Sequence, residues 1–149
     1  HLGLFNSSGH AELIIDKNDN LWMLEAAARG GGFHVFDKLV PVISGVNLPL
    51  MVAKLSLGKK LVNFQIKKNK AILKFFPSKK GIVKSISGFN ILQKYKNVDG
   101  DSFVNVQEEV SDASNDGDRM GYILVWGNNL IILNNLIKKL FYKIKFVVK

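Results

Sequence analysis

Two carboxylates, an arginine and a run of glycines lie close together near the start of the chain. Glu12 is followed thirteen positions later by Glu25, and Arg29 comes four residues after Glu25. The arginine is followed directly by three glycines, Gly30, Gly31 and Gly32. Mg²⁺ prefers carboxylate oxygens as ligands, and a guanidinium can bind two phosphate oxygens at once. Residues of these types could therefore hold a divalent metal and a phosphate together.

A hairpin is expected to carry the two carboxylates. Segments 11–16 and 21–26 are strand candidates, and the Lys, Asn and Asp residues between them favour a turn. Side chains alternate across a strand, so Met23 and Glu25 are expected to share one face. Given the right register, the hairpin presents Glu12 and Glu25 on a common face.

Two helices are predicted after the glycines. Apolar side chains at helical spacing predict a helix over 33–40, which should end or kink before Pro41. Asn47 is a suitable N-cap for a helix over 48–57, and Gly58 a suitable end.

The rest of the chain is predicted to form an antiparallel sheet with a terminal helix. Strands are predicted at 62–66, 70–76, 81–87, 103–110, 120–126 and 145–148, with a turn at 97–100. Asn128 or Asn129 should cap the helix, whose inner side would carry Leu130, Leu133, Ile137, Leu140, Phe141 and Ile144. The change of pattern predicts domains 1–58 and 59–149 in an α+β protein.

Composition narrows the function classes. The 149 residues carry a net charge of +9 and no cysteine, which excludes disulfides and thiolate metal sites and fits a reducing, cytoplasmic compartment. The charge comes from scattered lysines, which disfavours nucleic acid but leaves a non-catalytic basic binding module as an alternative. No apolar run reaches the about 18 residues of a membrane span, so no membrane partner is expected. The chain lacks an initial methionine and is expected to be part of a longer protein.

Several segments resemble the C-terminal end of an ATP-grasp domain, in the branch of carboxylate–amine ligases that includes L-amino acid ligases. In the first half these segments are 9–12, 24–25, 29–32, 44–48 and 57–58. In the second half, segments 75–77, 81–83 and 118–122 are similar to the small domain that follows ATP-grasp in those ligases.

The resemblance implies an enzyme that uses ATP to convert a carboxylate into an acylphosphate, which an amine then attacks. It implies that Glu12 and Glu25 bind Mg²⁺ or Mn²⁺, and that Arg29 is a catalytic residue that contacts phosphate. The wider family has an asparagine ligand where this chain has Ala27. The resemblance therefore leaves the complete ligand set open.

Further contacts and partners are implied in the same way. Phosphate or substrate contacts are expected at Gly30, Gly31, Gly32, His10 and His34. The partners would be a missing N-terminal part of the same enzyme and small carboxylate and amine substrates; a homodimer is left open. The isolated chain is expected to be inactive. An ATP-grasp carboxylase or purine-pathway enzyme is the alternative within the same fold.

Overall fold

The computed structural model describes residues 3, 5–61, 65–115 and 117–149. The chain forms two compact units, His1–Lys67 and Lys68–Lys149, and each is treated separately. The assignment of domains to 1–58 and 59–149 stays a prediction. The strand predicted at 62–66 falls largely on residues 62–64, which lie outside the described residues.

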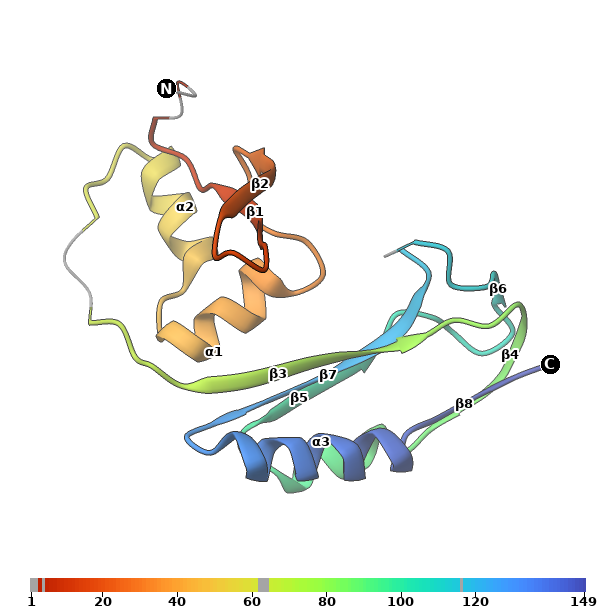
Figure 1. Ribbon diagram of the computed structural model, residues 1–149. Coiled ribbons are helices and arrows are strands. Elements are labelled where there is room, and N and C mark those ends of the chain that lie inside the picture. Colours follow the sequence, from red (N-terminus) through yellow and green to blue (C-terminus); the bar gives the residue numbers. More distant parts are fainter. Residues whose placement is uncertain (1–2, 4, 62–64, 116) are drawn as a thin grey trace. The chain divides into compact units, whose positions relative to one another are not determined.

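The first unit consists of a two-stranded hairpin and short helices (Figure 1). The elements are β1 (His10–Ile15), β2 (Leu21–Ala27), α1 (Val40–Ser44) and α2 (Leu48–Ser56). β1 and β2 pair in the antiparallel direction, which confirms the predicted hairpin.

The first helix continues past the point where it was predicted to end. A π-helical turn, Val35–Leu39, runs directly into α1, and the Val40 N–H donates to the carbonyl of Val35. Pro41 therefore falls in the first turn of α1, where a missing N–H breaks no helical hydrogen bond. The prediction that the helix ends before Pro41 is wrong for this reason, and the kink that was predicted as the alternative stays a prediction.

Helix α2 has the predicted boundaries to within one residue. The Asn47 side chain accepts a hydrogen bond of 3.0 Å from the N–H of Leu50, which confirms it as the N-cap. Beyond the helix, Gly58 has a φ of 66°, a left-handed conformation that suits glycine at a helix end.

Little of the first unit is buried. Val46 is the one buried side chain among the residues described in that unit. The hairpin exposes large apolar side chains from both of its strands, namely Leu13, Ile14, Ile15, Leu21, Trp22, Met23 and Leu24. The hairpin is thus held by its ladder and its turn rather than by a packed core within the described residues.

The described residues of the second unit form two antiparallel sheets, an α-helix and a 3-10 helix, Phe89–Lys94. One sheet has the order β3 (Lys70–Pro77), β7 (Arg119–Gly127), β5 (Val98–Ser102). The other has the order β6 (Glu109–Val110), β4 (Gly81–Ser87), β8 (Lys145–Val148). Helix α3 (Leu130–Lys143) lies along one face of the first sheet (Figure 1).

The core of this unit lies between the central strand and α3. Ile123 and Val125 of β7 are fully buried, as is Leu140 of α3. Asn129 caps the helix by accepting hydrogen bonds from the backbone N–H groups of two residues in its first turn. Leu130 was predicted to face inward, but it is 45% exposed at the first residue of the helix.

The segment 97–110 was predicted incorrectly. Residues 97–100 were predicted as a turn, yet Val98–Ser102 form β5, with Gly100 opposite Ile123. An ideal Cβ on Gly100 would lie 2.7 Å from the carbonyl oxygen of Tyr122, so glycine permits this close pairing. The strand predicted at 103–110 is reduced to Glu109–Val110, after a turn in which Gln107 has a φ of 73°.

The described residues contain no single helix that is long and apolar enough to cross a membrane. The bent pair Val35–Ser44 and Leu48–Ser56, with an angle of 112° between its halves, meets the length and composition criteria together.

Candidate functional site

The register of the hairpin brings the two predicted metal ligands together. Glu12 of β1 is the direct cross-strand partner of Glu25 in β2. Residues directly opposite each other project from the same face, with Cβ atoms about 4.5–5.5 Å apart. The prediction that these carboxylates share a face is therefore confirmed.

A β-bulge produces this pairing. From the turn up to Leu13, which is opposite Met23, the register is regular, and it shifts by one residue between Leu13 and Glu12. Without the shift, Glu12 would lie opposite Leu24, and Glu25 would project from the other face. The same shift places Met23 and Glu25 on opposite faces, so the prediction that those two share a face is wrong.

The turn of the hairpin is fixed by Asp16. Its carboxylate accepts hydrogen bonds of 3.0 Å from Trp22 Nε1, 3.1 Å from Asn20 Nδ2, 3.0 Å from the Asn20 N–H and 2.8 Å from the Asn18 N–H. These hydrogen bonds hold the pKa of Asp16 well below its usual value, and the bond from Trp22 has the largest effect. A rigid turn sets the register of the ladder that follows it.

Arg29 lies beside Glu25. Its Nη2 is 3.2 Å from Glu25 Oε1, and its Nη1 donates to the carbonyl oxygen of Gly30 at 3.1 Å. The two side chains are 59% and 51% exposed, so this ion pair contributes at most about 1 kcal/mol to stability. Its importance is spatial, because it places a guanidinium next to one of the two opposed carboxylates.

His10 lies beside the other carboxylate. It is two residues before Glu12 on the same strand face, opposite Ala27. Its Nε2 is 3.9 Å from Glu12 Oε1, and the side chain is 25% exposed. The structure thus gathers His10, Glu12, Glu25 and Arg29 around one face of the hairpin.

The three glycines have different surroundings. An ideal Cβ on Gly30 would lie 2.3 Å from the ring of Phe36, and one on Gly31 would lie 3.3 Å from the ring of His10. A Cβ on Gly32 would meet nothing within 4 Å. Gly30 and Gly31 therefore allow the loop to pack closely against aromatic rings. The three consecutive glycines in the sequence did not indicate this role.

His34 follows this loop in a left-handed conformation, with a φ of 60°. Its Nδ1 is 2.9 Å from Asp37 Oδ2, an interaction within its own helical segment. The contact fixes the ring relative to the helix that begins at Val35. A substrate contact by His34 stays a prediction.

The donor set fits Mg²⁺ in part. Two opposed carboxylates, Glu12 and Glu25, offer the oxygen ligands that Mg²⁺ takes, and Mg²⁺ commonly completes its octahedron with water and substrate phosphates. The described residues contain no group of three or more His, Cys, Asp or Glu side chains that could hold a metal. Position 27 is an alanine opposite His10, so no further ligand comes from that point of β2.

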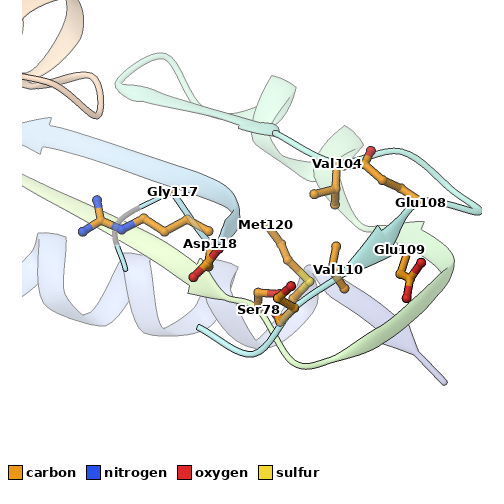
Figure 2. A pocket seen from close by; sticks show the side chains of 10 residues that line it. Ser78, Val104, Glu108, Glu109, Val110, Gly117, Asp118 and Met120 are labelled. Atoms are coloured by element: carbon orange, nitrogen blue, oxygen red, sulfur yellow. Dashed lines mark hydrogen bonds between the residues drawn. The ribbon is translucent and has the colours of Figure 1, made fainter. Parts of the chain in front are cut away.

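A pocket of about 210 Å³ in the second unit is a weaker candidate, although acidic side chains line it. Figure 2 shows the acidic side chains Glu108, Glu109 and Asp118 among the residues that line the pocket. Asp118 accepts hydrogen bonds from the Ser114 N–H, the Ser114 hydroxyl and the Asn115 N–H, which lower its pKa. Glu108 accepts one from the Asn105 N–H. These carboxylates hold their own loops in place.

A scan against protein-family models found no match, and a search of curated proteins also found none. The fold, however, is similar to that of several solved enzymes. An L-amino acid ligase from Bacillus licheniformis matches 95% of this chain with a TM-score of 0.79 at 18% identity. The chain has the fold of the C-terminal part of ATP-grasp structures.

Two other structures show the same similarity. A phosphoribosylglycinamide synthetase from Anaerococcus prevotii matches 99% of the chain with a TM-score of 0.79 at 21% identity. The biotin carboxylase domain of a 2-oxoglutarate carboxylase from Hydrogenobacter thermophilus, in complex with MgADP and bicarbonate, matches 96% with a TM-score of 0.74 at 16% identity.

The match is to the C-terminal part of these ATP-grasp structures, which confirms the predicted fold class. The chain spans 36% of the L-amino acid ligase, 38% of the synthetase and 32% of the carboxylase domain. It therefore corresponds to about a third of each of these three structures.

Proposed function

We propose that this chain is the metal-binding and phosphate-contacting part of an ATP-dependent carboxylate–amine ligase. The observation that carries the proposal is the direct pairing of Glu12 with Glu25, with Arg29 at 3.2 Å from Glu25, on an ATP-grasp fold. Opposed carboxylates next to a guanidinium suit a site where a metal ion and a phosphate group lie side by side.

In the proposed reaction, a carboxylate oxygen of the substrate attacks the γ-phosphorus of ATP. The bond from that phosphorus to the β-phosphate oxygen breaks, and ADP leaves with the electron pair. The amine nitrogen then attacks the acyl carbon, the carbon–oxygen bond to phosphate breaks, and inorganic phosphate leaves. Loss of a proton from the nitrogen gives the amide.

Glu12 and Glu25 would hold the metal ion, Mg²⁺ or Mn²⁺. A divalent ion held there would supply positive charge that offsets the negative charge developing on the transferred phosphoryl group. The MgADP found in the similar carboxylase domain supports ATP and a divalent metal as ligands of this fold.

Arg29 would bind the transferred phosphoryl group. Its guanidinium is more than half exposed and lies on the carboxylate side of the glycine loop, so it can turn towards a phosphate at little cost. Contacts of Gly30, Gly31, Gly32, His10 and His34 with phosphate or substrate are part of the proposal.

The other partners follow from the length of the similar enzymes. Since the chain matches about a third of each, we propose that the adenine site comes from an N-terminal part of the same cytoplasmic enzyme. The purified 149-residue chain should then show no ATP turnover. ATP hydrolysis by this chain that disappears in Glu25→Gln would contradict this.

The test is carboxylate-dependent ADP release by the intact protein, screened with ATP, Mg²⁺, amino acids and amines. Glu25→Gln and Arg29→Ala should each abolish it, while the control Glu109→Gln, at an exposed glutamate of β6, should retain it. Turnover close to that of the unaltered protein in both site variants would refute the site.

A carboxylase is the second candidate, because the biotin carboxylase domain shares the fold at a TM-score of 0.74. The same screen separates the two reactions. ADP release that requires bicarbonate and no amine would identify a carboxylase, whereas release that requires both an organic carboxylate and an amine would identify a ligase.

A further inference from the structure

His10 occupies a position between the glycine loop and Glu12. On one side its Nε2 is 3.9 Å from Glu12 Oε1. On the other side its ring lies against the backbone of Gly31, where an ideal Cβ would come within 3.3 Å of both Cδ2 and Nε2. One ring therefore contacts the loop that follows Arg29 and also faces one of the paired carboxylates.

The His10 ring is mostly buried, and one of its nitrogens lacks a hydrogen-bond partner among the described residues. Its Nδ1 is buried and has no hydrogen-bond partner among the residues that the structure describes. Its cross-strand partner is Ala27, whose methyl group is too short to hold an imidazole in place. The packing against Gly31 and the proximity of the Glu12 carboxylate are thus two contacts that bear on the orientation of the His10 ring.

Glu12 needs such a neighbour. The side chains of Glu12 and Glu25 are about equally exposed, at 54% and 51%. Glu25, however, has Arg29 Nη2 at 3.2 Å from its Oε1. A flexible glutamate loses rotamer freedom when it binds a metal, and this loss weakens binding. Some side chains do not bind the metal themselves but contact and orient a residue that does. Mutating such a side chain typically weakens metal affinity by about 10–100-fold.

We propose that His10 is a positioning residue that holds the Glu12 carboxylate ready for metal binding, and that the missing Cβ of Gly31 lets the His10 ring lie there without being displaced by a few tenths of an ångström. This inference rests on the proposed metal-binding role of Glu12. It gives His10 a role towards Glu12 in addition to the proposed phosphate or substrate contact, and it gives Gly31 a packing role that Gly32 does not have.

The test is Mn²⁺ affinity of the intact protein without turnover, from the electron paramagnetic resonance signal of free Mn²⁺. His10→Ala should weaken binding about tenfold or more, and His10→Gln, whose amide can still reach Glu12, should restore part of it. Gly31→Ala should weaken binding when His10 is present and have no further effect in His10→Ala, because coupled residues are non-additive.

Two further variants make the outcomes distinct. Gly9→Ala is the matched control, since an ideal Cβ there comes no closer than 4.0 Å to other atoms, and its Mn²⁺ affinity should be unchanged. If Glu12→Gln leaves Mn²⁺ affinity unchanged, the proposed metal site itself fails. If Glu12→Gln abolishes binding but His10→Ala does not weaken it, the metal site stands and the positioning role is refuted. Equal effects of Gly31→Ala with and without His10 would also refute it.

Discussion

Adding a single methyl group at Gly30 should disrupt the glycine loop, whereas the same change two residues later should not. An ideal Cβ on Gly30 would lie 2.3, 2.5 and 2.7 Å from Cγ, Cδ2 and Cδ1 of the Phe36 ring. Carbon atoms in contact are normally about 3.5–4.0 Å apart, so the ring would have to withdraw by about 1 Å. At Gly32 an added Cβ would meet nothing within 4 Å.

The expected magnitudes follow from these distances. Forcing an extra methyl group into a packed position costs about 1–3 kcal/mol. Replacing glycine by alanine also restricts the unfolded chain, which stabilises the folded state by about 0.4–1 kcal/mol where the site is open. Gly30→Ala should therefore lower the free energy of unfolding by about 1–2 kcal/mol, and Gly32→Ala should leave it unchanged or raise it slightly.

Urea unfolding of the first unit can measure this difference. The chain has two tryptophans, so in a Trp126→Phe background the fluorescence of Trp22 reports on the hairpin unit alone. A second background, Phe36→Ala, removes the ring, and there Gly30→Ala should have almost no cost. Equal destabilisation by Gly30→Ala and Gly32→Ala, or a cost that persists without the Phe36 ring, would refute the packing role of Gly30.

Two other predictions concern the turn and the core. The lowered pKa of Asp16 means that its carboxylate stabilises the turn at pH values above the unfolded pKa of about 3.9, and that this stability is lost as the pH falls further. Trp22 fluorescence should therefore change below about pH 4, and Asp16→Asn should remove that change; an identical acid transition in the variant would contradict the role of Asp16. In the second unit, Leu140→Ala should cost about 2–5 kcal/mol, because Leu140 is fully buried in the core. Ile132→Ala on the same helix, where Ile132 is 63% exposed, should change the free energy of unfolding by no more than about 0.5 kcal/mol. Both variants can be measured by urea unfolding followed through Trp126 fluorescence. Equal losses of unfolding free energy in the two variants would contradict the packing of Leu140.

Elements with strong local signals could be predicted from the sequence. The turn of Asn and Asp before Leu21, the capping residues Asn47 and Asn129, and the apolar strand β7 all have their predicted places. Caps and turns depend on hydrogen bonds to backbone groups a few residues away, so the residues themselves contain the information.

The edge strand β5 could not be predicted in this way. Its sequence, Val-Asp-Gly-Asp-Ser, has the composition of a turn, and it becomes a strand because β7 provides a pairing partner. Long-range pairing outweighs local preference at such positions. The helix through Pro41 also differed from expectation. There the helical hydrogen bonds change from the π pattern to the α pattern, and this change accommodates the missing N–H of Pro41.

At the candidate site, the sequence alone determined which residues were present and how far apart they lay along the chain. It predicted a hairpin with Glu12, Glu25 and Arg29, because carboxylate spacing and turn residues are local features. It did not determine that Glu12 lies opposite Glu25. A one-residue bulge in the ladder decided that, because a shift of one residue moves a side chain to the other face of the sheet.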